Sequence, residues 1–179
     1  DIGKINQHYF CNSTAIGTIP KAVQQVKPNK KKWLGALAYF IEGFKVLRKN
    51  KAYTFHIEVD GEQFSEKSIL VLVSSSFSVG GMETLIPDAQ VNDGNLHLIV
   101  LKGAKVWDKL NILPKLITGT ITKDNQVIYR KFKKGKIRIE ENEEVFCNVD
   151  GEKGDSLPIE LTILEKHLTV FTTPKQQRK

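Results

Sequence analysis

The chain has 179 residues, of which 40% are hydrophobic and 26% charged, as is typical of a globular domain that needs no disulfide framework. It contains no apolar run near the roughly 20 residues of a membrane-spanning helix and no cysteine–histidine cluster of the kind that binds zinc. The formal net charge of +7 indicates an anionic partner, either nucleic acid or an acidic membrane surface, and composition alone does not choose between them.

Most of the chain has the residue pattern of short β-strands. Residues 8–19 are apolar and rich in β-branched side chains, and residues 53–59 alternate, with the apolar side chains at the odd positions. Mainly apolar strands are predicted at 68–77 and 95–102, and further strands at 126–132, 136–141, 144–150, 158–165 and 167–173. This succession predicts a mainly β fold, an antiparallel β-sandwich, in a single domain that spans residues 1–179.

Two segments have helical spacing instead. Apolar residues recur every three or four positions over 31–48, which predicts a helix. A shorter helix is predicted over 105–119, interrupted by Pro114 and ended by Gly119. The expected architecture is therefore a sandwich with one or two helices.

The tetrapeptide Val-Asp-Gly-Glu occurs twice, at 59–62 and at 149–152. The first copy follows an alternating strand, and its Asp-Gly pair is a strong signal for a tight hairpin turn. The second copy is followed by another Gly-Asp pair, so that Asp150, Glu152 and Asp155 lie within six residues. A carboxylate on a tight turn beside a sheet suits a general base, while an acid-rich surface turn is the structural alternative.

Residues 78–96 predict a long polar loop after a central strand. Gly80 and Gly81 allow the backbone to turn, and Asp93 lies in an Asn-Asp-Gly sequence. Its carboxylate, together with backbone carbonyls of the loop, would supply the hard oxygen ligands that Mg²⁺ or Ca²⁺ prefer. A simple turn without metal is the alternative.

The order of these pieces resembles the C-terminal domain of the bacterial diacylglycerol kinase-like lipid kinases, a family that includes the sphingosine and ceramide kinases. The resemblance extends over essentially all 179 residues, and its most specific stretches are Pro-x-Ala-x-x-Asn/Asp-Asp-Gly-x-Leu at 87–96 and Val-Asp-Gly-Glu-x-Gly-Asp at 149–155. It implies a β-sandwich that packs against an N-terminal nucleotide-binding domain, with the active site in the cleft between them. The Gly-Gly-Asp-Gly-Thr motif of that domain is absent, so the chain, which begins at Asp1 rather than at a methionine, resembles one half of such a kinase.

The resemblance also assigns roles to particular residues. Glu152 matches the family's proton acceptor, whereas the copy at 59–62 matches no functional motif. Gln90, Asp93 and Asn95 match a structural Mg²⁺ site, in which the aspartate binds through its side chain and the other two positions through main-chain carbonyls. Asp1 matches an acidic residue at the domain junction.

The activity implied is transfer of the γ-phosphoryl group of ATP to a hydroxyl of a glycerolipid such as diacylglycerol, and this chain alone is expected to be inactive. The implied partners are the glycerolipid, the protein's own N-terminal nucleotide-binding domain and an acidic membrane surface, but not nucleic acid. The expected location is the cytoplasm, peripherally at the inner face of the membrane. Basic runs at 27–32, 45–51 and 130–138 would supply the attraction.

Two alternatives stay open. A nucleic-acid-binding β-domain would use the aromatic residues Tyr129 and Phe132 within the basic strand at 126–132. A non-catalytic membrane or interaction module would use the same positive charge without any chemistry.

Overall fold

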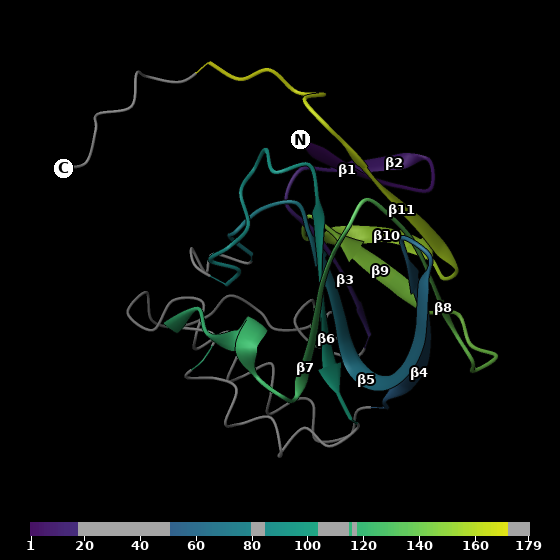
Figure 1. Ribbon diagram of the computed structural model, residues 1–179. Helices are drawn as coiled ribbons and strands as arrows, with labels where there is room; N and C mark the ends of the chain where they lie inside the picture. The colour runs from purple at the N-terminus through teal and green to yellow at the C-terminus, as the bar shows by residue number, and fades with distance from the viewer. Residues whose placement is uncertain (18–50, 80–84, 104–114, 116–117, 172–179) are drawn as a thin grey trace, which may run out of the picture.

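The computed structural model describes residues 1–17, 51–79, 85–103, 115 and 118–171. Within these residues, eleven antiparallel strands form one sheet, whose longest path has the order β10-β9-β3-β5-β4-β8-β11-β1-β2, while β6 pairs with β5 and β7 with β6 (Figure 1). The elements are β1 Ile2–Ile5, β2 His8–Phe10, β3 Ser13–Gly17, β4 Tyr53–Val59, β5 Glu62–Ser74, β6 Leu96–Lys102, the 3-10 helix η3 Ile121–Lys123, β7 Val127–Phe132, β8 Lys134–Ile139, β9 Phe146–Val149, β10 Glu152–Ser156 and β11 Ile159–Leu164.

The sheet curls around a hydrophobic core because its longest strand changes partners. The first half of β5 pairs with β4, and the second half pairs with β3 and β6, with a shift of register between Ser68 and Val71 on the β6 side. Such irregularities bend a strand and increase its twist. The inner face of the curled sheet encloses a large core that includes Phe10, Phe55 and Phe132.

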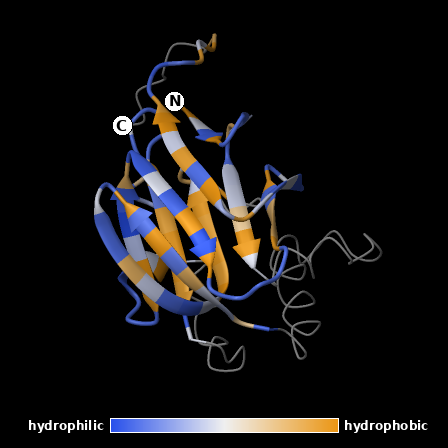
Figure 2. Cartoon of the chain, turned by 90° about the vertical axis from the view of Figure 1, so that its right-hand side faces the viewer, coloured by the Kyte–Doolittle hydropathy of each residue, from blue (hydrophilic) through white to orange (hydrophobic). Residues whose placement is uncertain are grey.

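A second hydrophobic cluster lies on the other face of β5 and β6. It joins Ile69 and Ile99 of these strands to Leu85, Ile86 and Ile121, which come from the connecting segments. Where both faces of a strand are covered, the strand is apolar throughout. Where one face meets solvent, apolar and polar residues alternate along it, which appears as banding in Figure 2.

Side chains join the two edges of the longest strand path. Asp155 of β10 accepts a hydrogen bond from Asn6 Nδ2 at 2.9 Å, in the turn between β1 and β2, and lies 3.4 Å from His8 Nε2 of β2. Because β10 and β2 are the two ends of that path, these contacts close the curl without a backbone ladder.

The predicted mainly β, antiparallel fold is confirmed. The strand predicted at 53–59 has the predicted bounds. The other predicted strands up to 158–165 all overlap observed strands, although the one at 68–77 begins earlier, at Glu62, and the one at 8–19 is split into β2 and β3. The helix predicted over 31–48 lies outside the described residues, as does most of the one predicted over 105–119, of which residues 115 and 118 have helical backbone.

The strand predicted at 167–173 is wrong over its described part, because residues 167–171 pair with no strand. Three of its apolar residues, Leu168, Val170 and Phe171, are exposed, with Phe171 at 103% of its reference area. An alternating pattern becomes a strand only when the segment pairs with a neighbouring edge, and residues 167–171 pair with none of the free edges of the described sheet. In addition, no helix among the described residues has both the length and the apolar character needed to cross a membrane.

Candidate active site

The loop before β6 is held in place by Asp93. Its Oδ1 accepts a hydrogen bond from the backbone N–H of Asn95 at 3.0 Å, and its Oδ2 accepts one from the N–H of Gln90 at 3.3 Å. Buried Ile86 and Ala89 attach the start of the loop to the second hydrophobic cluster. The carboxylate of Asp93 therefore holds Gln90 and Asn95, the other two residues predicted to bind a metal ion, next to Asp93.

Behind this loop, a buried polar chain runs into the sheet. His97 Nε2 lies 3.1 Å from Asp93 Oδ2, and His97 Nδ1 lies 2.8 Å from the hydroxyl of Tyr129. Burial lowers the pKa of the fully buried His97, against the opposing effect of Asp93, so the ring is neutral at pH 7. Burial, together with the carboxylates of Asp88 and Asp93, raises the pKa of Tyr129 to about 12.

The sequence assigned neither residue to this site, and Tyr129 was named only as an aromatic residue for contact with nucleic acid. The only signal was one histidine, four positions after Asp93, in an otherwise apolar strand. A neutral imidazole can donate from one nitrogen and accept at the other. His97 thus donates to Asp93 and accepts from Tyr129, which leaves both buried groups satisfied.

Asp1 attaches the same loop to the start of the chain. Its Oδ2 accepts a hydrogen bond from the N–H of Gly94 at 2.8 Å, and its Oδ1 accepts one from the N–H of Lys166 at 2.7 Å. Its amino group donates to the carbonyl of Val91 at 2.9 Å. The residue that the resemblance placed at the domain junction therefore contacts the Asp93 loop directly.

The second Val-Asp-Gly-Glu copy forms the turn between β9 and β10. Asp150 and Gly151 both have positive φ angles, of 48° and 99°, as a type I′ turn requires. Glu152 is the first residue of β10, pairs in register with Val149 and is exposed. The tight turn thus places the predicted general base at the end of a strand.

The carboxylate of Asp150 binds three consecutive backbone N–H groups between β2 and β3. The donors are Cys11 at 2.7 Å, Asn12 at 3.0 Å and Ser13 at 2.7 Å. Gly3 pairs with Phe10, so the β1–β2 hairpin brings the chain back and places Cys11, Asn12 and Ser13 near Asp1. The turn that carries Glu152 therefore lies beside the N-terminal segment, whose first residue contacts the Asp93 loop.

The first copy folds in the same way. Asp60 and Gly61 have φ angles of 47° and 90°, and the Asp60 carboxylate accepts hydrogen bonds from the backbone N–H groups of Lys133 and Lys134. Its glutamate, Glu62, pairs with Arg130, which lowers the pKa of Glu62 through hydrogen bonds and charge. In contrast, Glu152 has no hydrogen bond or ion pair with any described side chain.

The donor set of the Asp93 loop fits a hard cation. An ionised carboxylate has about four acceptor positions, and three of those on Asp93 are used by Gln90, Asn95 and His97. One position on Oδ1 is left, and Mg²⁺ prefers carboxylate, carbonyl and water oxygens. The described residues contain no cluster of three acidic, histidine or cysteine side chains that would hold a cation by side chains alone, so main-chain carbonyls would have to complete this site.

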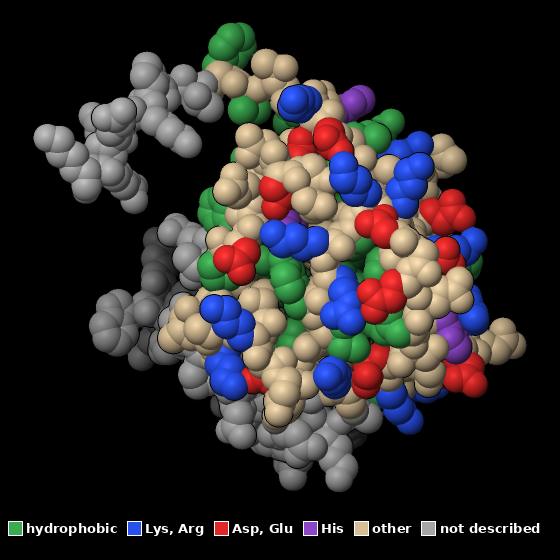
Figure 3. Space-filling model, viewed as in Figure 1, with side chains coloured by type: hydrophobic (Ala, Val, Ile, Leu, Met, Phe, Trp, Pro, Cys, Tyr) green, Lys and Arg blue, Asp and Glu red, His purple; other side chains and the backbone are tan. Residues whose placement is uncertain are grey.

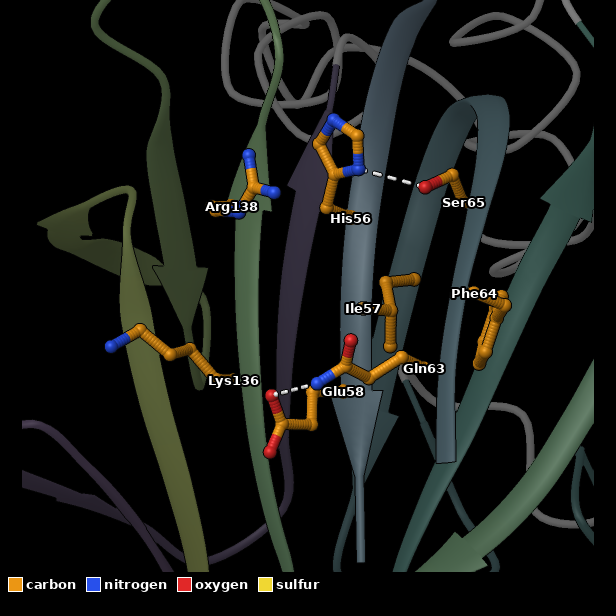
Figure 4. Close-up of a pocket in the computed structure, with 8 residues that line it drawn as sticks. All are labelled: His56, Ile57, Glu58, Gln63, Phe64, Ser65, Lys136 and Arg138. Atoms are coloured by element: carbon orange, nitrogen blue, oxygen red, sulfur yellow. Dashed lines mark hydrogen bonds between the residues drawn. The ribbon is translucent and has the colours of Figure 1, made fainter. Parts of the chain in front are cut away.

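An open groove of about 300 Å³ lies elsewhere, on the outer face of β4, β5 and β8 (Figure 4). Within it, Glu58 accepts a hydrogen bond from Gln63 and Lys136 pairs with Glu160, whereas Arg138 forms no ion pair with a described residue. This groove includes none of the residues of the candidate active site.

The basic run at 130–138 is likewise interspersed with acidic side chains. Arg130 pairs with Glu62 and Lys133 with Glu165, and Figure 3 shows acidic and basic side chains mixed over this face of the molecule. Phe132 is buried in the core, and Tyr129 is half-buried with its hydroxyl bonded to His97. The aromatic residues that favoured a nucleic-acid-binding domain are therefore not stacking platforms.

Comparison with known proteins places the chain in a family. The family model described as the YegS C-terminal NAD kinase beta sandwich-like domain matches residues 15–172. Diacylglycerol kinases of Staphylococcus epidermidis and Staphylococcus aureus are 36% identical over 172 and 171 residues, which cover 96% of this chain and 54% of each relative. The chain thus spans about half the length of these curated relatives.

Solved structures agree on the fold. A crystal structure from Bacillus anthracis described as a "putative diacylglycerol kinase" has a TM-score of 0.73 and 22% sequence identity, over 92% of this chain and 53% of that one. A second structure of the same description has a TM-score of 0.68 and 23% identity, with the same coverage. The chain therefore belongs to the family of YegS C-terminal NAD kinase beta sandwich-like domains and is homologous to proteins named diacylglycerol kinase.

Proposed function

We propose that residues 1–179 form the C-terminal domain of an ATP-dependent lipid kinase that phosphorylates a hydroxyl of a glycerolipid such as diacylglycerol. ATP would be bound mainly by an N-terminal nucleotide-binding domain outside this chain, so this domain alone would not phosphorylate lipid. The homologous diacylglycerol kinases support the reaction class.

Glu152 is the proposed general base. It is exposed at the start of β10, and of the three carboxylates on its hairpin it alone has no partner among the described residues, since Asp150 and Asp155 are held by the N-terminal segment. This observation carries the assignment, because an unpaired, exposed carboxylate can approach a hydroxyl. In the reaction, the carboxylate takes the proton of the lipid hydroxyl while that oxygen bonds to the γ-phosphorus and the bond to the ADP oxygen breaks.

Asp93 is the proposed side-chain ligand of a structural Mg²⁺, with the main-chain carbonyls of Gln90 and Asn95 as further ligands. When bound, the ion would supply positive charge that braces the loop. Asp1 then connects this loop to the N-terminal segment, which also holds the hairpin of Glu152. These contacts would keep the proposed metal site and the proposed general base at a constant distance from each other.

The lipid substrate lies in a membrane, so the enzyme would act peripherally at an acidic membrane surface, at the cytoplasmic face. The net charge of +7 supports this partner. In the described part of the basic run at 130–138, Lys131, Lys134 and Arg138 form no ion pair with a described residue and so remain to attract anionic lipid.

The test is transfer of radiolabelled phosphate from ATP to diacylglycerol in mixed micelles by the full-length protein and its Glu152→Gln variant. A glutamine has nearly the same shape but accepts no proton, so turnover should fall by about 10²- to 10⁴-fold, while ATP binding measured by calorimetry stays unchanged. Normal turnover of the variant would refute Glu152 as the base, and no transfer by the wild type to any glycerolipid would refute the lipid kinase.

A further inference from the structure

The hairpin that carries Glu152 is attached to the N-terminal segment at two points, one on each side of Glu152. Asp150, in the turn, accepts hydrogen bonds from the N–H groups of Cys11, Asn12 and Ser13. Asp155, later in β10, contacts Asn6 and His8. Attachment at two points restricts both the position and the rotation of the strand segment between them.

A β-bulge makes the second attachment possible. Lys153 pairs with Asn148 but Ser156 pairs with Phe146, so two residues, Gly154 and Asp155, lie opposite Cys147. In a regular strand, residues 152 and 155 would point to opposite faces. The extra residue reverses the alternation beyond it and turns Asp155 to the face on which Glu152 lies.

Only glycine fits at the bulge. A Cβ atom on Gly154 would lie 2.4 Å from Val149 Cγ2 and 2.8 Å from the sulfur of Cys147. The Cys147 thiol also donates a hydrogen bond to the carbonyl of Asp155 at 3.1 Å, which holds the bulge from the buried side. The close packing of Val149 and Cys147 against the bulge therefore fixes the orientation of Asp155.

The second contact of Asp155 crosses from one edge of the sheet to the other, since β10 and β2 end the longest strand path. Asp1, at the start of the same N-terminal segment, binds the N–H of Gly94 beside Asp93. The segment from Asp1 to Ser13 is thus bonded to both the Asp93 loop and the Glu152 hairpin.

We propose that Asp150 and Asp155 are positioning residues for Glu152. They fix its hairpin against the N-terminal segment and so set the distance between the general base and the Asp93 loop. Because their own oxygens are occupied by backbone and side-chain donors, they leave Glu152 as the carboxylate that receives the proton. This inference rests on the proposed function of Glu152.

The first Val-Asp-Gly-Glu copy supplies a matched control. Asp60 makes the same kind of turn and holds the backbone of Lys133 and Lys134, but its hairpin carries Glu62, which is paired with Arg130. Asp60→Ala should therefore weaken the fold in the way that Asp150→Ala does, without moving the general base.

The experiment compares kcat and KM of the full-length protein with its Asp150→Ala, Asp155→Ala, Asp60→Ala and Glu152→Gln variants, at a temperature where circular dichroism shows each to be folded. We expect Asp150→Ala and Asp155→Ala to lower kcat about tenfold to hundredfold, as for a displaced catalytic group, with KM for ATP unchanged. Asp150→Asn, which retains one acceptor oxygen, should recover part of kcat, and it replaces Asp150→Ala if that variant does not fold. Asp60→Ala should keep the wild-type kcat.

The outcomes separate the inference from the function on which it rests. An inactive Glu152→Gln together with wild-type kcat in both the Asp150 and Asp155 variants overturns the positioning role alone. An equal loss of kcat in Asp60→Ala also overturns it, because the effect would then follow general weakening of the fold. Normal turnover of Glu152→Gln overturns the proposed base and the inference with it.

Discussion

Glu62 and Glu152 occupy equivalent positions in two hairpins of identical turn sequence, yet only Glu62 is paired with an arginine. Each glutamate follows an Asp-Gly turn with positive φ angles and pairs in register with the valine that precedes the turn. Arg130 of β7 reaches Glu62 at 3.1 Å, and no described cation reaches Glu152. An arginine on β7, not the tetrapeptide, therefore decides which of the two glutamates forms an ion pair.

Replacement of Glu62 tests this difference. Glu62→Gln removes the ion pair with Arg130 but leaves the turn and the candidate site in place, so we expect turnover of the full-length protein to equal that of the wild type. The pair lies on the surface, where such pairs contribute little. The same phosphate-transfer assay used for Glu152→Gln measures the effect, and a comparable loss in both variants would contradict the assignment of the second copy.

The buried His97 predicts a loss of stability in acid. Its pKa is lower in the folded protein than the ordinary value of 6.5, because burial disfavours the charged ring more than Asp93 favours it. As the pH falls below about 6.5, the unfolded chain therefore takes up the proton first, and the stabilisation present above that pH is lost. The slope contributed by one proton is about 1.4 kcal/mol per pH unit.

Urea unfolding of the full-length protein between pH 5 and pH 8 measures this effect. His97→Gln keeps a donor toward Asp93 but cannot take up a proton, so its free energy of unfolding should change less steeply between pH 5 and pH 6.5 than that of the wild type. The groups that surround the ring are Asp93, Tyr129 and Lys131. Parallel slopes in the two proteins would show that His97 does not titrate in this range.

The proposed metal site predicts stabilisation by Mg²⁺ in the absence of nucleotide. A ligand that binds only the folded state raises the melting temperature in a concentration-dependent way. We therefore expect Mg²⁺ to raise the melting temperature of the full-length wild-type protein, and Asp93→Asn to abolish the increase. Glu152→Gln, which leaves the loop intact, serves as the control and should retain it. An equal increase in Asp93→Asn would exclude this loop as the site.

The membrane partner predicts binding that depends on lipid charge. Each Lys or Arg near an anionic surface contributes about 1 kcal/mol, so the full-length protein should sediment with vesicles that contain phosphatidylglycerol and not with phosphatidylcholine alone. Replacing Lys131, Lys134 and Arg138 together with glutamine should weaken the binding, whereas Lys133→Gln and Lys136→Gln, which are paired with glutamates, should have a smaller effect. Equal sedimentation with neutral vesicles would argue against electrostatic attachment.

Much of the fold could be predicted from periodicity, because side chains alternate along any strand that has one buried face. The bounds of β4 followed directly from residues 53–59, and both Asp-Gly turns followed from their need for positive φ angles. The segment 167–171 shows the limit of this reasoning. Alternating apolar and polar residues show that a segment could form a strand with one buried face. Whether the segment pairs with another strand depends on residues elsewhere in the chain.

By itself, the sequence determined the β-rich architecture, the two tight turns and the candidate residues Glu152, Asp93, Gln90 and Asn95, since these follow from local pattern and from motif resemblance. Only the tertiary structure decided that His97 and Tyr129 stand behind Asp93, and that Asp150 and Asp155 attach to residues more than a hundred positions away. The physical reason is that neighbouring residues largely determine the backbone conformation. Long-range hydrogen-bond partners, in contrast, depend on which distant strands come together when the sheet curls around its core.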